Sequence, residues 1–145
     1  MHLMAFQFTE HMDFLFPYEP GQPEMFTVNT DSYLYELLRV RSKYEDQIKV
    51  CFGVELGLQT DAVKENAVYA KCYDFDMIIA SLHLVDKVDP YHPEYFMDKT
   101  EEEAYGLYFT RIYENLLRFS NFDTLGHLDY IIRYGENKDK NYRYE

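Results

Sequence analysis

The stretch FDMIIASLHLV, residues 75–85, is the most strand-like segment of the sequence, and His83 stands near its end. Its run of apolar and β-branched residues predicts a buried strand. A second apolar stretch, IKVCFGVEL at residues 48–56, has Glu55 near its end. The segment between the two strands is too long for a hairpin. A parallel pair of strands with a helix between them is therefore expected.

The same alternation extends in both directions along the chain. Strands are predicted over residues 4–9, 48–56 and 75–85, and residues 122–134 are predicted to form a fourth strand and its exit. Helices are predicted to begin at Asp31 or Ser32, at Thr60 or Asp61, and at Thr100, where Thr100 and Glu103 have the spacing of a capping box. Two proline-containing loops cover residues 14–29 and 86–99. This order predicts one α/β domain, with about four parallel strands and flanking helices.

Polar side chains stand at the end of each predicted strand. They are His11, Glu55, His83 and His127. Because parallel strands point the same way, we expect these side chains to meet at one edge of the sheet, where βα folds bind ligands. Imidazole nitrogen and carboxylate oxygen together suit Zn, Mn or Fe, and the carboxylate could bridge two ions. The pattern therefore predicts a metal site.

Each of these residues also has an ordinary structural explanation, because a single His or Glu at a strand end is more often packed or solvated than a ligand. Three of the five histidines fall at strand ends, and this shared position favours the metal site. Arg133 follows the fourth strand. It is either an ordinary surface residue or a phosphate-binding residue whose guanidinium donates two parallel hydrogen bonds. The pair Ser81 and His83 lacks an orienting third group for nucleophilic catalysis.

Composition excludes some classes of partner. Acidic residues outnumber basic ones, 26 to 14, for a formal net charge of −12, so a nucleic-acid-binding module is not expected. No apolar run is long enough for a membrane span. Cys51 and Cys72 lack CxxC spacing and are expected to be reduced thiols in a cytoplasmic protein.

Four segments resemble successive motifs of the polymerase-and-histidinol-phosphatase (PHP) family, and they are closest to its histidinol-phosphatase branch. They are FTEHMD, FGVELGLQ, FDMIIASLHLVD and FDTLGHLDYIIRYG. The resemblance implies a TIM-like (β/α)7 barrel with two or three metal ions, and hydrolysis of a small phosphorylated substrate, L-histidinol phosphate, in histidine biosynthesis. It implies that His11, His83 and His127 are metal ligands, that Glu55 bridges two ions, and that Arg133 contacts phosphate.

The sequence departs from that family pattern in two places. It contains no His-x-His motif and no Asp-x-His motif, which the family carries on its first strand and near its C-terminus. A TIM-like barrel typically needs ~250 residues. Residues 1–145 are therefore predicted to be a partial PHP domain, in which Glu55, His83 and His127 bind one metal weakly and phosphatase activity is low.

Three further expectations follow from this partial barrel. Its open sheet edges favour a homodimer. One alternative function is that of another PHP phosphoesterase, acting on nucleotides or nucleic-acid ends. The other is that the chain is a non-catalytic truncated remnant.

Overall fold

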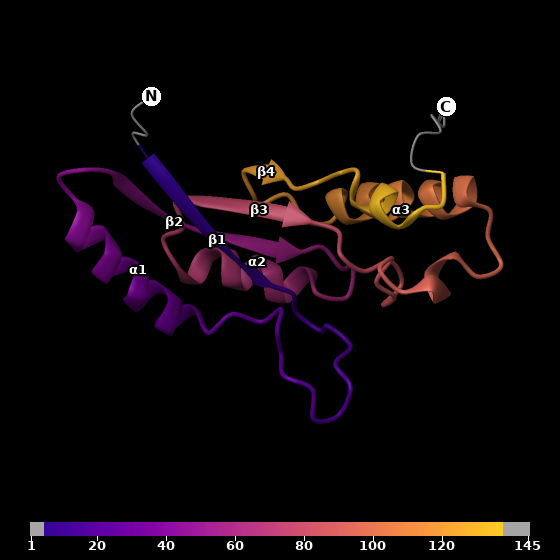
Figure 1. Ribbon diagram of the computed structural model, residues 1–145, viewed down its shortest axis with the longest axis horizontal. Coiled ribbons are helices and arrows are strands. Elements are labelled where there is room, and N and C mark those ends of the chain that lie inside the picture. The colour runs from indigo at the N-terminus through magenta and orange to yellow at the C-terminus, as the bar shows by residue number, and fades with distance from the viewer. Residues whose placement is uncertain (1–4, 138–145) are drawn as a thin grey trace.

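The computed structural model describes residues 5–137 and contains a four-stranded parallel sheet in the order β1-β2-β3-β4. The strands are β1 (Ala5–Met12), β2 (Lys49–Gly57), β3 (Met77–Ser81) and β4 (Thr124–Leu125). The helices are α1 (Thr30–Tyr44), α2 (Val63–Cys72) and α3 (Glu101–Leu116), with short 3-10 helices η1 (Pro93–Phe96) and η2 (Tyr130–Tyr134). Figure 1 shows the strands side by side with helices flanking them. The predicted α/β fold is confirmed.

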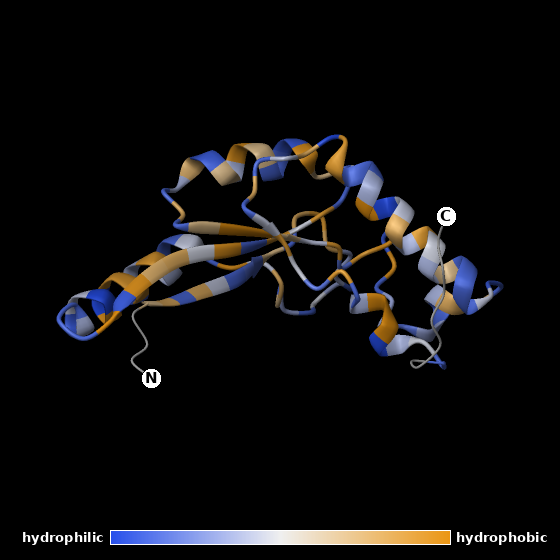
Figure 2. Ribbon diagram, turned by 90° about the horizontal axis from the view of Figure 1, so that it is seen from above, coloured by the Kyte–Doolittle hydropathy of each residue, from blue (hydrophilic) through white to orange (hydrophobic). Residues whose placement is uncertain are grey.

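The strand β2 lies at the centre of the fold because it can be buried on both faces. Val54 and Leu56 are fully buried, as the continuous apolar run predicts. They belong to a core that also includes Tyr69 of α2 and Tyr108 of α3. Burying one such aliphatic side chain contributes about 1.5–3 kcal/mol. Figure 2 shows hydrophobic residues concentrated along the strands.

A smaller apolar cluster holds α1 against the other end of the sheet. Leu37 of α1 packs with Val50 and Phe52 of β2. The Tyr33 hydroxyl donates hydrogen bonds to the carbonyls of Phe8 and Gly53, which ties α1 to β1 and β2 together. This packing holds β1 beside β2 in a register that pairs His11 with Glu55.

The fourth predicted strand is the largest error in the secondary structure. In the segment 122–134, predicted as a strand and its exit, the strand β4 contains only Thr124 and Leu125, and Tyr130–Tyr134 forms η2. Gly126 lies so close to β3 that a Cβ there would overlap the Ser81 hydroxyl. The chain leaves the sheet after this close approach, which places His127 in the irregular segment beyond β4 rather than in a strand.

Other boundaries differ by a few residues. The strand predicted over residues 4–9 reaches Met12, and residue 4 lies outside the described range. The strand predicted over residues 75–85 ends at Ser81, so His83 follows it. Helix α1 is capped by Asn29, not by Asp31 or Ser32, because the Asn29 side chain accepts a hydrogen bond from the Ser32 N–H.

The start of α2 was also predicted too early. This helix begins at Val63 and has no side-chain cap, because residues 60–61 lie in the preceding turn. The predicted capping box of Thr100 and Glu103 is confirmed at the start of α3. Both cysteines are free. Between residues 5 and 137, none of the helices combines the length and the apolar character that a membrane crossing needs.

Candidate metal centre

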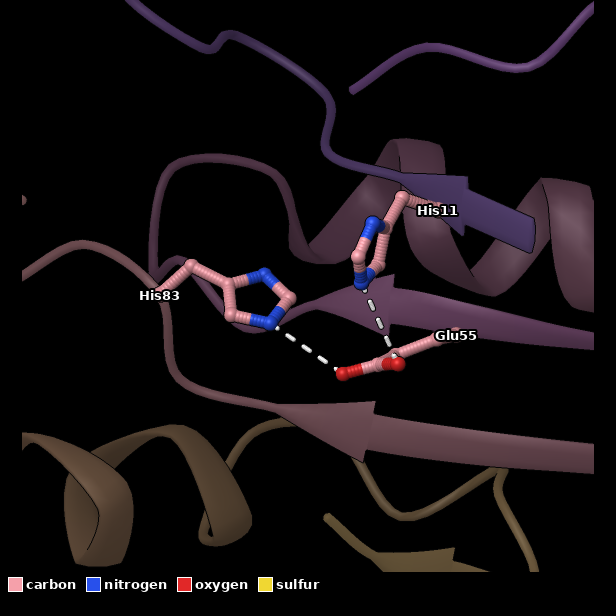
Figure 3. Close-up of side chains that lie close together, drawn as sticks. All are labelled: His11, Glu55 and His83. Atoms are coloured by element: carbon pink, nitrogen blue, oxygen red, sulfur yellow. Dashed lines mark hydrogen bonds and ion pairs between the residues drawn. The ribbon is translucent and has the colours of Figure 1, made fainter. Parts of the chain in front are cut away.

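The four predicted ligands meet at the carboxyl ends of the strands. His11 is the second-to-last residue of β1, and Glu55 of β2 lies opposite it in the register. His83 and His127 follow β3 and β4 by two residues each. Figure 3 shows His11, from β1, and His83, from the segment after β3, pointing at the Glu55 carboxylate. The predicted convergence of these side chains at one edge is confirmed.

The two oxygens of Glu55 contact different histidines. Oε1 lies 3.1 Å from His83 Nε2 and 3.0 Å from His127 Nε2. Oε2 lies 3.2 Å from His11 Nε2. We call Oε1 with His83 and His127 the inner position, and Oε2 with His11 the outer position. The two oxygens of one carboxylate therefore contact different histidines, two at Oε1 and one at Oε2.

These separations fit a shared metal ion. Ligand atoms bound tetrahedrally at Zn–N distances of ~2.0–2.1 Å lie roughly 3.3 Å from each other. In the inner position the Nε2 atoms of His83 and His127 are 3.4 Å apart, and both are within 3.1 Å of Glu55 Oε1. The ligand atoms of His11, Glu55 and His83 also lie within 4.8 Å of one another. The residues present could therefore hold a divalent metal ion.

Asp13 supports the inner position from behind. Its side chain is 1% exposed, and its Oδ1 lies 2.8 Å from His83 Nδ1. A proton on Nδ1 donated to Asp13 leaves the Nε2 lone pair of His83 for a metal, as carboxylate–histidine pairs commonly do. A Cβ at Gly57 would overlap Asp13 Oδ1, so this placement needs glycine at position 57.

Without a metal, hydrogen bonds from protonated histidine nitrogens hold the cluster together. Burial would raise the pKa of Glu55, but hydrogen bonds from His11, His127 and His83 outweigh it and hold that pKa far below its usual range. Burial lowers the pKa of His83, yet hydrogen bonds to Asp13 and Glu55 raise it to about 9. The hydrogen bond to Glu55 raises the pKa of His11. A metal would replace protons on the same nitrogen atoms.

Two buried atoms of the cluster have unused hydrogen-bonding capacity. In residues 5–137, Asp13 Oδ2 and His127 Nδ1 are buried and have no hydrogen-bond partner. Buried polar atoms are nearly always paired in folded proteins, and exceptions often mark sites for water or ions. This observation agrees with a site whose function requires a further bound species.

The ligands line a small cavity that also includes Arg133. The cavity has a volume of about 220 Å³. The Arg133 guanidinium lies 5.6 Å from the centre of the Tyr130 ring, and within the described part of the chain it forms no ion pair. Asp129, two residues after His127 in the sequence, is exposed and does not line the cavity. The side chains that line the cavity are His11, Asp13, Phe16, Phe26, Glu55, His83, Asp89, His127, Tyr130 and Arg133.

Some of these residues were not predicted as part of the site. Asp13 is not among the predicted ligands, although it stands two positions after His11 and the alternation of an extended strand places both side chains on one face. Phe16, Phe26 and Asp89 lie in the two proline-containing loops, and Tyr130 follows β4. No local pattern distinguishes these four from ordinary loop residues.

Comparison with known proteins agrees with the geometry. The PHP domain family matches residues 1–145. A histidinol-phosphatase of Lactococcus lactis subsp. lactis (strain IL1403) is 33% identical over 138 residues, which cover 94% of this chain and 49% of that protein. A probable histidinol-phosphatase of Clostridium acetobutylicum is 30% identical over 131 residues, 90% of this chain and 48% of that protein. The chain thus spans about half the length of these relatives.

A solved structure gives the same relationship in three dimensions. The crystal structure of the Lactococcus lactis histidinol phosphate phosphatase, complexed with zinc, L-histidinol and phosphate, matches with a TM-score of 0.83 and 34% identity. The match covers 92% of this chain and 49% of that one. Sequence and fold agree, and this chain belongs to the PHP domain family.

Proposed function

We propose that this site takes part in metal-dependent hydrolysis of a phosphate monoester, with L-histidinol phosphate as the substrate. The observation that carries the proposal is the Glu55 carboxylate, whose oxygens lie 3.0 to 3.2 Å from the nitrogens of three histidines. The relatives at 33% and 30% identity are a histidinol-phosphatase and a probable one, which supports the choice of substrate.

Each residue has a separate role in this proposal. Glu55 and the three histidines, His11, His83 and His127, would hold divalent ions, for which zinc, manganese and iron are all chemically suitable. When bound, such ions supply positive charge that polarises a phosphoryl oxygen and favours deprotonation of water. Asp13 keeps His83 in the orientation in which Nε2 faces the cavity.

Arg133 is proposed to bind the phosphate group. Within the described residues 5–137, it is the only lysine or arginine that lines the 220 Å³ cavity. Its planar guanidinium can donate two parallel hydrogen bonds to phosphate oxygens. A local cation is needed because the chain has a net charge of −12, which repels an anionic ester. Bound metal ions would add to this local positive charge.

We expect residues 1–145 alone to have weak metal binding and low phosphatase activity. The sequence has neither a His-x-His nor an Asp-x-His motif, and among residues 5–137 the outer position has one histidine, His11, beside Glu55. The test is isothermal titration with Zn²⁺ or Mn²⁺, followed by phosphate release from L-histidinol phosphate. Undetectable metal binding would contradict the site. Turnover near the ~10 s⁻¹ typical of enzymes would contradict the low activity.

The same assay should include other phosphate esters. If nucleotides or oligonucleotide ends were hydrolysed faster than L-histidinol phosphate, another phosphoesterase activity would replace this proposal. If metal bound but no ester were hydrolysed, the chain would be a non-catalytic remnant by itself.

We also propose that two copies of the chain associate through the β1 edge. Within residues 5–137 the backbone of β1 pairs with β2 on one side, and on the other only its end bridges to another segment, at Met12 and Thr27. Phe6 and Phe8 on this strand are 46% and 40% exposed. Long, apolar edge strands tend to pair with another chain. Sedimentation should show a dimer, and a monomer at all concentrations would contradict it.

The absence of nucleic-acid or membrane partners and a cytoplasmic location remain predictions from composition.

A further inference from the structure

A second, larger cavity opens directly from the metal cavity. Its volume is about 540 Å³. The two cavities share four lining residues, Phe16, Phe26, Asp89 and Tyr130. We call the larger cavity the aromatic groove, and it is lined by Phe16, Tyr18, Gln22, Pro23, Met25, Phe26, Asp89, Tyr91, His92, Tyr130 and Tyr134. A molecule that reaches the metal ligands therefore has room to extend into this groove.

One wall of the groove starts at the outer position. The ring of Phe26 lies 6.1 Å from that of His11, and Phe16 lies 4.7 Å from Phe26. Tyr18 extends the wall at 4.8 Å from Phe16, and its hydroxyl accepts a hydrogen bond from the Phe26 N–H. The Asp13 N–H donates to the Phe26 carbonyl at 2.8 Å. Backbone hydrogen bonds thus hold this wall beside the ligands.

The opposite wall starts at the inner position. The Tyr130 ring lies 5.1 Å from that of His127 and 5.9 Å from that of His83. Tyr134 follows at 5.2 Å from Tyr130, and Tyr91 follows at 5.8 Å from Tyr134. Each wall is therefore a chain of ring contacts that leads away from a metal-site histidine. Such walls suit a flat ring, which stacks on aromatic faces.

Asp89 places a negative charge between the two walls. Its Oδ1 accepts hydrogen bonds from the Tyr91 N–H at 2.9 Å and from the Tyr130 hydroxyl at 3.1 Å. Both bonds fix the carboxylate where the two cavities meet. Within residues 5–137 no lysine, arginine or histidine forms an ion pair with Asp89. A ligand that carries a cation would supply the missing counter-charge, and the aromatic faces would add a cation–π attraction.

We propose that the aromatic groove binds the organic part of the phosphate ester and selects one that combines a flat ring with a positive charge, with Asp89 as the counter-charge. This inference rests on the proposed function, since the metal cavity would hold the phosphate group. The groove discriminates against nucleotides, whose bases are flat but uncharged at neutral pH. It also discriminates against aliphatic amines, which have the charge and lack the ring.

The test separates ring from charge with three phosphate-free probes. The full chain is titrated by NMR with L-histidinol (ring and charge), L-leucinol (charge only) and adenosine (ring only). L-histidinol should bind most tightly. Asp89→Asn keeps the side-chain shape and an acceptor oxygen, and it should weaken L-histidinol about tenfold while leaving adenosine unchanged. Tyr91→Ala removes an exposed ring of the wall and should weaken L-histidinol but not L-leucinol.

Glu24→Gln is the matched control, because Glu24 is an exposed carboxylate of the same loop as Phe26 and does not line the groove. It should change none of the affinities. Equal affinities for the three probes, or L-histidinol affinity that is the same in wild type and Asp89→Asn, would overturn the inference. Circular dichroism identifies a variant that fails to fold, and the probe comparison on wild-type protein then decides alone.

Inorganic phosphate with Zn²⁺ distinguishes this inference from the proposed function. Phosphate binding that requires Zn²⁺ and is unchanged in Asp89→Asn supports the division between the two cavities. If Zn²⁺-dependent phosphate binding is absent but L-histidinol binds through Asp89, the proposed function fails and the groove inference stands. If phosphate binds and L-histidinol does not, the groove inference fails.

Discussion

The inner and outer positions share one carboxylate and differ in everything around it. In the inner position the side chains of His83 and His127 are 11% and 24% exposed, and Asp13 supports His83 from behind. In the outer position the His11 side chain is 43% exposed, and within residues 5–137 it is the only histidine in contact with Oε2. The two oxygens of Glu55 are therefore chemically equivalent, but their surroundings differ. The number of nitrogens and the burial of the site, rather than the carboxylate, should determine which position binds metal first.

Removing the charge of Glu55 should eliminate both positions at once. In Glu55→Gln the amide is a poor metal ligand, so Zn²⁺ affinity should fall by more than the ~10- to 100-fold typical for loss of a group that only orients a ligand. Isothermal titration measures the change. Glu65→Gln is the matched control, because Glu65 is an exposed carboxylate on α2. Retention of wild-type affinity in Glu55→Gln would refute the shared-carboxylate site.

A change at Asp13 should affect only the inner position. Asp13→Asn keeps the shape but weakens the hydrogen bond to His83 Nδ1, so Zn²⁺ affinity should fall by ~10- to 100-fold. Long-range ¹⁵N–¹H NMR of the imidazoles should show an altered tautomer at His83 and an unchanged one at His11. Asp46→Asn, at an exposed turn outside the site, serves as a control. An unchanged His83 tautomer would show that Asp13 has no orienting role.

The smallest effect is expected in the pH dependence of the metal-free chain. The pKa of His83 is raised to about 9 by Asp13 and Glu55, against an ordinary value near 6.5. Because the folded pKa is the higher one, the stabilisation is fully present below pH ~6.5 and is lost as the pH rises to about 9. Within this window the free energy of unfolding should fall by at most ~1.4 kcal/mol per pH unit for one proton.

Urea unfolding in EDTA at several pH values measures this slope. His83→Ala should remove it, whereas His11→Ala should retain most of it, since His11 is more exposed and contacts one carboxylate where His83 contacts two. The same slope in wild type and in His83→Ala would contradict the assignment of this proton to the inner position.

The sequence predicts where three of the four candidate ligands lie, because each of these three is marked locally. His11, Glu55 and His83 each stand at or just beyond the end of an apolar run, and parallel strands bring such ends together. The parallel direction of the strands follows from the same alternation of β and α segments. For these features, residues within a few positions of each other contain enough information.

The remaining features depend on contacts between distant residues. Asp13 supports His83 from 70 positions away in the sequence, and nothing in its neighbourhood indicates that partner. The short length of β4 depends on how closely Gly126 approaches Ser81 of another strand. The aromatic groove requires two loops to face each other, with Phe26 on one side and Tyr130 on the other. Periodicity cannot predict these arrangements.

Zinc titration of wild type, His83→Ala and His11→Ala side by side tests the inequality of the two positions most directly. We predict that His83→Ala abolishes the strongest binding event and that His11→Ala leaves that event within a few fold of wild type. Equal losses in the two variants, or a larger loss in His11→Ala, would contradict the view that the buried side of Glu55 is the principal metal site.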